Sequence, residues 1–420
     1  MNIELIKKNY NKWILQKSEY NRAYEYYKGN TDAMKNYKMV TERNNNRANT
    51  NFLKKFVKEE VSYSVGNDIT YISKSSNESI VNDIDYYLEC WKEDHDSNLA
   101  KNMILYGLTY ELYYISNKEL HSRVISPRNA FAVKNERDEL LYFAHCYTLE
   151  DKEYIDVYDN KFIYHLDNKF IQVKEPNPHI FGIVPVGIAE LSEEGIKDTI
   201  YNDIKGLQDA YETNLSDISN EISDFRNAYL KLTGVKLEDE DAKKMKKMGI
   251  IQINDKYGNA DWLIKNINDA FIQNTLSILE DKMYQLSNHI NHNEKMQSNT
   301  SSLALRSRLI SLEEKCKLNQ KALTNCIKAR LRVLFIYLKI IFNKNYDYRD
   351  IKIKFTPNIP QDDLMMAQII SQLGDKLSTE TGLSQLSFIE NAKNELDKIK
   401  AEQESVLEGD KLLEDVDSNE

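Results

Sequence analysis

Residues 302 to 343 carry apolar side chains at helical spacing and include neither Gly nor Pro. Because Gly and Pro are the usual interruptions of a helix, this stretch predicts one continuous helix, about 60 Å long at 1.5 Å per residue. A compact domain of 420 residues has a radius of gyration of only about 22 Å. Such a helix would cross the molecule or protrude from it, so we expect an elongated chain.

Composition extends this expectation to the rest of the sequence. The chain has 13 Gly and 6 Pro, far below the roughly 12% that these two residues together contribute to average proteins. All-β and doubly wound folds need both residues for their many turns. The shortage therefore predicts a helix-rich α+β fold with long helices.

Charge and cysteine usage exclude several classes of protein. The formal net charge is −10, whereas a sequence-specific DNA reader carries a strongly basic face. The four cysteines form no CxxC pair, which is typical of reduced thiols in the cytoplasm and argues against a zinc ribbon. The N-terminus has no signal-peptide pattern, and the longest apolar run, 331–342, is too short and too charged to cross a bilayer.

Hydrophobic periodicity changes along the chain. Residues 1–106 show mainly helical spacing, and residues 108–175 alternate in a way that predicts a mixed antiparallel sheet, before a proline-rich linker near 176–185. After this linker the pattern predicts an amphipathic helix at 198–226, a small α/β insert, a helix at 269–289, a polar loop at 291–302, the long helix, a strand at 351–356 and acidic C-terminal helices.

Charge is segregated along the sequence. Residues 190–226 hold ten acidic and three basic residues, residues 301–344 hold two acidic and ten basic ones, and residues 389–420 hold eleven acidic and four basic ones. Such blocks suggest subunits that match acid to base, or a surface presented to a polyanion. Solvation of ordinary helix faces explains the same blocks, so the pattern alone leaves these alternatives open.

The motifs of common enzymes are missing. The sequence has no glycine-rich phosphate loop, no GxSxG and no HExxH. His289 and His292 come nearest to a metal pair, but no third ligand lies near them in the sequence, and loop polarity is the simpler interpretation. We therefore assign no catalytic, cofactor-binding or metal-binding residue, and a metal hydrolase is the least favoured hypothesis.

Several short motifs follow one another over nearly the whole chain. They are YYKG at 26–29, NTNFLKKFVKEEVSYSVGNDI at 49–69, YGLTYELYY at 106–114, GIVPVGIAE at 182–190, IKGLQDAYETNLSDISNEISDF at 204–225, SLALRSRL at 302–309, FTPNIPQDD at 355–363 and STETGLSQLSFIENAKNELDKI at 378–399. Each motif alone is weak, but their common order is specific. The chain resembles the portal (head-to-tail connector) proteins of tailed double-stranded DNA bacteriophages, and especially the portal family of long-tailed phages of Gram-positive bacteria.

The resemblance implies an elongated portal fold with a wing, a two-helix stem, a small α/β clip, a tunnel loop and a C-terminal helical crown. The implied segments are the wing at 1–195, stem helices at 196–226 and 269–290, the clip at 227–268, the tunnel loop at 291–302, a long helix and strand of the wing at 303–375, and the crown with an acidic tail at 376–420.

The resemblance also implies a function without catalysis or cofactors. Portal proteins form a ring, usually of twelve subunits, at one capsid vertex, and this ring is the channel for DNA packaging and ejection. The implied partners are double-stranded DNA without sequence specificity, the terminase large subunit, the major capsid and scaffolding proteins, and a head-completion adaptor, with no membrane. The protein would be assembled in the host bacterial cytoplasm and remain in the virion.

A cytosolic helical scaffold or adaptor protein is the alternative. It would use its long helices for coiled-coil partners, which requires a regular heptad stripe. Leu309, Leu312, Cys316 and Leu323 begin such a stripe, but Lys and Arg interrupt it. The portal hypothesis is therefore favoured.

Three groups of residues follow from the portal resemblance. An acidic stem would repel phosphate and keep DNA from sticking, a polar tunnel loop would touch DNA weakly, and the clip would carry a docking surface. The groups are Asp203, Asp209, Asp217, Glu221 and Asp224 for the stem; Asn291, Asn293, Lys295, Gln297 and Asn299 for the DNA-facing loop; and Lys243, Lys244, Lys246, Lys247, Asp255 and Lys256 for the clip.

Overall fold

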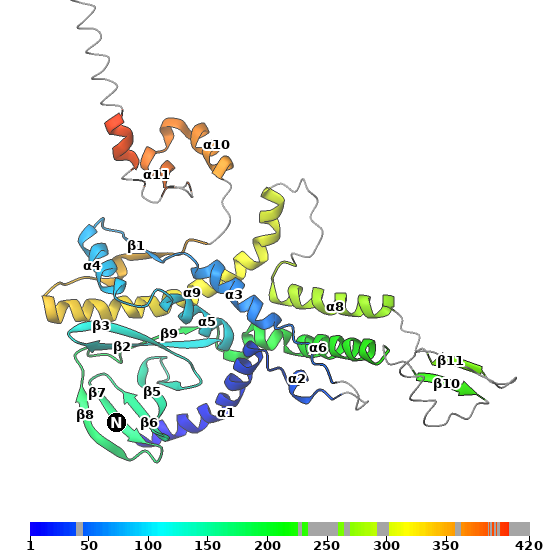
Figure 1. Cartoon of the computed structure of the whole chain (residues 1–420). Coiled ribbons are helices and arrows are strands. Elements are labelled where there is room, and N and C mark those ends of the chain that lie inside the picture. The colour runs from blue at the N-terminus through cyan, green and yellow to red at the C-terminus, as the bar shows by residue number, and fades with distance from the viewer. Residues whose placement is uncertain are drawn as a thin grey trace, which may run out of the picture. The chain divides into compact units, whose positions relative to one another are not determined.

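Figure 1 shows the computed structural model of the chain. The structure describes residues 1–38, 45–225, 229–233, 259–263, 269–291, 302–357, 363–384, 386, 389, 392 and 395–402. The chain divides into two compact units, Met1–Gln297 with Ser307–Pro357 and Ser298–Arg306 with Asn358–Glu420.

Helices frame the first unit and lead into the second. In chain order they are α1 (Ile3–Lys28), α2 (Asp32–Asn36), α3 (Phe52–Val65), α4 (Glu78–Glu89), α5 (His95–Tyr106), η1 (Gly195–Asp198), α6 (Ile200–Phe225), α8 (Asp269–Ser287), α9 (Ser302–Phe342) and η2 (Tyr348–Asp350). The continuous helix predicted at 302–343 is confirmed as α9, and the helices predicted at 198–226 and 269–289 are confirmed as α6 and α8.

Local sequence explains where α1 begins and ends. The side chain of Asn2 accepts a hydrogen bond from the amide of Leu5 at 3.1 Å and so caps the first turn. Gly29 ends the helix at a φ of +90°, a conformation that residues with a Cβ rarely adopt. The polar cap and the terminal glycine together fix a helix of 26 residues.

Most strands lie in the middle of the chain, and a few short ones lie before and after it. They are β1 (Thr70–Ser73), β2 (Leu108–Ser116), β3 (Glu119–Ile125), β4 (Ala130–Lys134), β5 (Leu140–Leu149), β6 (Lys152–Tyr158), β7 (Phe162–Asp167), β8 (Gln172–Pro178), β9 (Val186–Glu190), β10 (Tyr229–Thr233), β11 (Asn259–Leu263) and β12 (Ile351–Lys354). The strand predicted at 351–356 is confirmed as β12, which pairs with β1.

The middle strands form two antiparallel sheets, so the single mixed sheet of the sequence analysis is wrong. One sheet has the order β3-β2-β9 and the other the order β4-β5-β6-β7-β8. β2 pairs with β9 from far along the chain, with Leu108 opposite Glu190, and local periodicity contains no signal for such a pairing. β8 extends into the proline-rich segment, because at the edge of a sheet a missing N–H costs no ladder hydrogen bond.

Three buried clusters hold these layers together. The first joins α3, α5, α9 and β2, and includes Phe56, Met103 and Leu334. The second packs the first half of α1 on the five-stranded sheet through Ile6 and Trp13. The third lies between the two sheets, on β2 and β9 of one and β4, β5 and β6 of the other. Burial of each such side chain contributes about 1.5–3 kcal/mol, so the sheets and the long helix form a single supporting body for α6.

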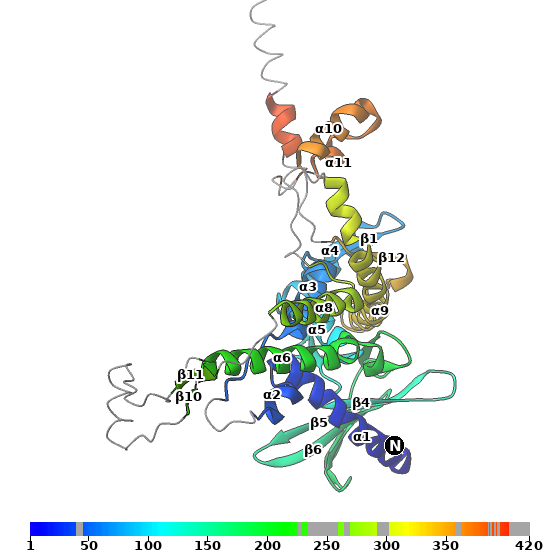
Figure 2. The same ribbon diagram turned by 90° about the vertical axis from the view of Figure 1, so that its right-hand side faces the viewer.

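α6 and α8 pack side by side, and the β10–β11 pair follows the end of α6 (Figures 1 and 2). The two strands are antiparallel, with Tyr229 opposite Leu263. This order of helix, strand pair and returning helix matches the predicted two helices with an insert between them. Residues 234–258, between these two strands, lie outside the described residues.

The second unit is helical where it is described. It contains α10 (Asp363–Leu373), η3 (Gly374–Lys376), α11 (Thr379–Leu383) and a helical stretch at 395–402. Ser378 caps α11 by accepting a hydrogen bond from the amide of Thr381 at 3.3 Å. Across the described ranges, no helix has the length and apolar character that crossing a membrane requires.

Candidate channel and assembly segments

One face of α6 buries polar side chains instead of apolar ones. Gln208, Glu212, Ser216 and Asn220 follow one another at four-residue spacing, which places them on one face of the helix, and all four are fully buried. A buried polar group without a partner costs about 1–3 kcal/mol. All four find hydrogen-bonding partners on residues 46–53, the segment that leads into α3.

Glu212 is the centre of this polar face. Its carboxylate accepts hydrogen bonds from the amide of Thr50 at 3.1 Å, from the hydroxyl of Thr31 at 2.5 Å and from the side-chain amide of Gln208 at 3.2 Å. Hydrogen bonds to a charged acceptor are each worth about 1.5–3 kcal/mol. The carboxylate therefore fixes α6 to two parts of the N-terminal region that are far from it in sequence.

Asn220 makes the corresponding attachment two turns further along α6. It accepts from the amide of Asn46 at 2.7 Å and donates to the carbonyl of the same residue at 2.8 Å. It also donates to the hydroxyl of Tyr37 at 3.0 Å. Because both backbone groups of Asn46 are satisfied by one side chain, residues 46–53 lie along α6 in a defined register.

The acidic residues predicted for the stem divide into two kinds. Asp209 accepts hydrogen bonds from the hydroxyl of Tyr26 at 2.6 Å and the amide of Ala33 at 3.1 Å, and Asp217 accepts one from the hydroxyl of Tyr37 at 2.7 Å. Burial raises the pKa of Tyr26, and its hydrogen bond to Asp209 raises it further. These two carboxylates therefore bind their own chain, as well as adding negative charge to α6.

The other predicted acidic residues lie on the same helix. Asp203 is exposed and Glu221 is half-buried. Asp224 belongs to the last turn of α6, and its side chain lies outside the described residues. None of these placements tests whether the face lines a channel, so that role stays a prediction.

His289 is a packing residue at the end of α8. Its ring stacks on Phe56 with 4.5 Å between the ring centroids, and its nitrogens lie 2.8 Å from the carbonyl oxygen of Ser287 and 3.1 Å from that of Phe56. Burial, aided by the positive charge of Lys315, lowers the pKa of His289 to about 3, so the ring is neutral. His292 lies outside the described residues, among which no cluster of three potential metal ligands occurs.

An ion pair connects the helices before and after the predicted tunnel loop to α3. Glu60 of α3 is fully buried and lies 2.8 Å from the amine of Lys315 on α9, while Asn319 donates to its other oxygen at 2.8 Å. Lys315 also donates to the carbonyl of Ser287 at the end of α8, at 3.1 Å. Burial raises the pKa of Glu60, and Lys315 opposes that shift.

Sequence reasoning missed this cluster. The only available signal was an acidic residue between the apolar positions of the second N-terminal helix, which is also the pattern of an ordinary exposed side chain. Of the loop itself, Asn291 is described and donates to Glu280 at 3.5 Å. Asn293, Lys295, Gln297 and Asn299 lie outside the described residues, as do Lys243, Lys244, Lys246, Lys247, Asp255 and Lys256 of the clip.

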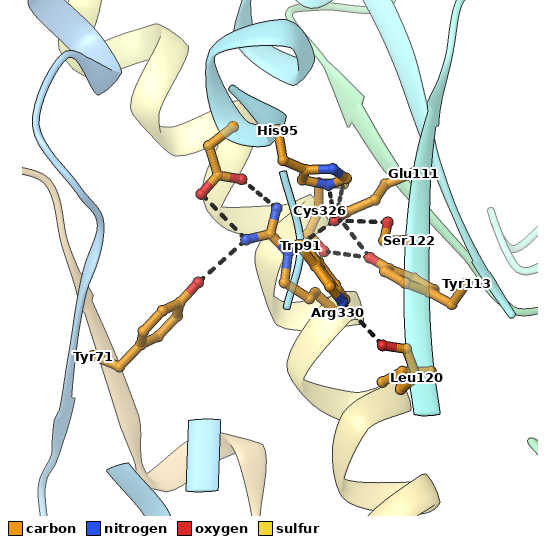
Figure 3. A network of polar contacts seen from close by, with 10 residues as sticks. Tyr71, Trp91, His95, Glu111, Tyr113, Leu120, Ser122, Cys326 and Arg330 are labelled. Atoms are coloured by element: carbon orange, nitrogen blue, oxygen red, sulfur yellow. Dashed lines mark hydrogen bonds and ion pairs between the residues drawn. The ribbon is translucent and has the colours of Figure 1, made fainter. Parts of the chain in front are cut away.

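A second buried charge cluster joins α9 to β2 and α5 (Figure 3). Arg330 is 1% exposed. Its guanidinium donates to Glu111 at 2.9 Å, to Asp96 at 2.5 Å and to the hydroxyl of Tyr71 at 3.2 Å. The planar fork of arginine suits such convergent acceptors, so this one side chain connects three elements to the long helix.

Glu111 is the buried partner in this cluster. It also lies 2.8 Å from His95 Nε2 and accepts from the hydroxyl of Tyr113 at 2.9 Å. Burial alone would raise the pKa of Glu111, but the charge of Arg330 and these hydrogen bonds lower it to about 2. The carboxylate is thus fully ionised and paired, which makes the cluster a structural connection between α9, β2 and α5.

Some basic residues of α9 make ion pairs inside the molecule, and others are exposed to solvent. Lys315 and Arg330 make the two buried attachments described above. Lys321, Lys328, Arg332 and Lys339 are exposed and have no hydrogen-bond or ion-pair partner within the described ranges. The alternatives of an acidic neighbour and a polyanion therefore concern this exposed set.

Comparison with known proteins identifies the class of protein. A family model described as "Phage portal protein, SPP1 Gp6-like" matches residues 6–409, nearly the whole chain. The chain belongs to this family, and it is a phage portal protein, a structural component of the head-to-tail connection of a virion. This match confirms the resemblance found from the sequence motifs, and it leaves the helical adaptor hypothesis without support.

One relative and two solved structures are similar to the chain. The chain is 23% identical over 428 residues to the portal protein of Bacillus phage SPP1, a match that covers 90% of this chain and 82% of that protein. Among solved structures it is similar to the neck of an empty gene transfer agent particle, with a TM-score of 0.48, 10% identity and coverage of 79% and 89%. The neck of the native particle gives a TM-score of 0.47, 10% identity and coverage of 80% and 89%.

Proposed function

We propose that twelve copies of this chain form a closed ring at one capsid vertex and that the genome passes through it during packaging and ejection. The packing of α6 against α8 supports this proposal (Figure 2). These two long helices, with the β10–β11 pair between them in the chain, are held by the body of helices and sheets described above. Identical subunits joined by a heterologous contact close into a ring when their rotation divides the circle.

The acidic face of α6 would line this passage. Asp203 and Asp217 are exposed and carry charge of the same sign as DNA phosphate, so duplex DNA would be repelled instead of retained. A channel lined with lysine or arginine would hold DNA through release of counterions. The loop at 291–302, with Lys295 as its basic residue, would touch double-stranded DNA weakly and without sequence specificity.

The segment between β10 and β11 would be the docking surface for other proteins of the virion. Lys243, Lys244, Lys246 and Lys247 form a basic run there, followed by Asp255 and Lys256. The partners proposed for this surface are the terminase large subunit during packaging and a head-completion adaptor afterwards. Reversal of the four lysines to glutamate should abolish co-purification with terminase while rings still form, and loss of rings would contradict this assignment.

The proposed assembly takes place in the host bacterial cytoplasm, with the major capsid and scaffolding proteins around the ring, and involves no catalysis by this chain. Negative-stain images of the purified protein test the architecture directly. Closed rings with a central hole are expected. Particles without a hole under every condition that favours assembly would contradict the proposed function.

A further inference from the structure

The exposed basic residues of α9 form one line along the helix. Lys321, Lys328 and Arg332 follow one another at intervals of seven and four residues, which places them within about 40° of one another on a helix of 3.6 residues per turn. We call them the basic face of α9. Along the helix axis their positions are about 10.5 Å and 6 Å apart.

An acidic line with the same intervals lies on α4. Glu78, Asp85 and Glu89 are exposed and are again separated by seven and four residues. They form the acidic face of α4, opposite the buried Ile80 and Ile84. In the described part of the chain no hydrogen bond or ion pair involves these three carboxylates.

The two faces do not meet within one subunit. α4 contacts α9 through Tyr87, whose ring centroid lies 5.7 Å from that of Tyr337. Asp83 of α4 lies 2.7 Å from Lys344, just after the end of α9. Tyr337 is nine residues beyond Lys328, which places it on the opposite side of the helix. The basic face of α9 is therefore directed away from the acidic face of α4 in the same chain.

We propose that the basic face of α9 binds the acidic face of α4 of a second copy of this chain, and that this contact closes the ring; the inference deepens the function proposed above and rests on it. Two different and complementary surfaces on one subunit are what a heterologous ring contact requires. Because the intervals of seven and four residues follow in the same order, three ion pairs form in register when the two helices run parallel.

A second copy fits these faces better than DNA does. A DNA-binding surface explains the lysines and the arginine of α9, but it leaves the acidic face of α4 without a partner. Burial and the neighbouring charge of Glu89 raise the pKa of Asp85, so these carboxylates already repel each other. An approaching row of cations relieves that repulsion, whereas the chain as a whole, with a net charge of −10, does not attract a polyanion.

Two charge-reversal variants test the contact. One carries K321E, K328E and R332E on α9, and the other carries E78K, D85K and E89K on α4. Each alone places like charges opposite each other, so we expect assembly to need at least about tenfold more protein than the wild type does. An equimolar mixture of the two variants restores opposite charges at every contact and should form rings again.

Size-exclusion chromatography with light scattering measures the assembly, and circular dichroism shows that each variant is folded. Two folded variants that assemble like the wild type, or whose mixture stays unassembled, would overturn the proposal. Normal rings of the α9 variant with weakened binding of duplex DNA would assign that face to a polyanion instead. A wild type that forms no ring would refute the proposed function itself, so the two failures are distinguishable.

Discussion

Lys315 of α9 lies 2.8 Å from Glu60 of α3 and also donates to the backbone carbonyl of Ser287 at the end of α8. One amine therefore joins the helix that precedes the predicted tunnel loop to the helix that follows it, and it anchors both on a third helix. Removal of Lys315 would leave the buried carboxylate of Glu60 without its cation, at a cost of about 3–5 kcal/mol.

His289, next to this cluster, should make stability depend on pH. Its pKa is about 3 in the folded chain, against an ordinary value of 6.5, so the unfolded chain binds a proton more readily. The contribution of His289 to the free energy of unfolding is present in full above pH 6.5. It falls as the pH drops below 6.5, by about 2 kcal/mol at pH 5. Thermal melting at pH 8 and pH 5 measures this loss.

The control for this prediction is His289→Gln, which does not titrate. The difference between pH 8 and pH 5 should shrink by about 2 kcal/mol in the variant. His145, whose pKa burial and the charge of Arg123 lower to about 4, contributes the part that remains. An unchanged pH dependence in the variant would show that His289 is not the group responsible.

Replacement of Arg330 by Met should destabilise the chain strongly. It leaves the ionised and fully buried Glu111 without its cation, at a cost of about 3–5 kcal/mol. The matched control is Arg349→Ala, since the ion pair of Arg349 with Asp347 is exposed and screened by solvent, and its loss should leave stability nearly unchanged. Equal melting temperatures for the two variants would contradict the structural role of the cluster in Figure 3.

Glu212→Ala should release residues 46–53 from α6. The amide of Thr50 donates to Glu212, so it loses its acceptor, and its hydrogen exchange should accelerate together with that of its neighbours. Asp203→Ala, an exposed change on the same helix, serves as the control and should leave exchange in this segment unaltered. Continued protection in Glu212→Ala would mean that the polar face of α6 does not hold the segment.

The charge of α6 should control how DNA moves through the ring. Asp203→Lys adds a cation at an exposed position in every subunit. Duplex DNA should then be retained by purified rings at low salt, and retention should fall steeply as salt rises. The wild type should retain little DNA under the same conditions, and equal retention by both proteins would argue against a channel-lining position for Asp203.

The sequence was informative where structure is local. The helices α6, α8 and α9 follow from apolar spacing within each segment. The pairing of β2 with β9 did not follow, because its partners are brought together only by the folded body.

The candidate site was predicted less completely for the same reason. Acidic residues on α6 were expected to face a channel, yet Asp209 and Asp217 also bind Tyr26 and Tyr37, which lie 183 and 180 residues away in the sequence. Nothing in the spacing of α6 distinguishes a carboxylate that accepts a tyrosine hydroxyl from one that faces solvent. The motifs that carry the family resemblance, by contrast, were readable because their order along the chain is itself a linear signal.

Native mass spectrometry of the purified protein tests the central claim most directly. Twelve copies of the 49.1 kDa chain form a ring of about 590 kDa, and we predict a dominant species of that mass. Addition of scaffolding protein and changes of salt and magnesium concentration define the conditions that favour assembly. A chain that remains monomeric or dimeric under all of them would contradict a portal ring.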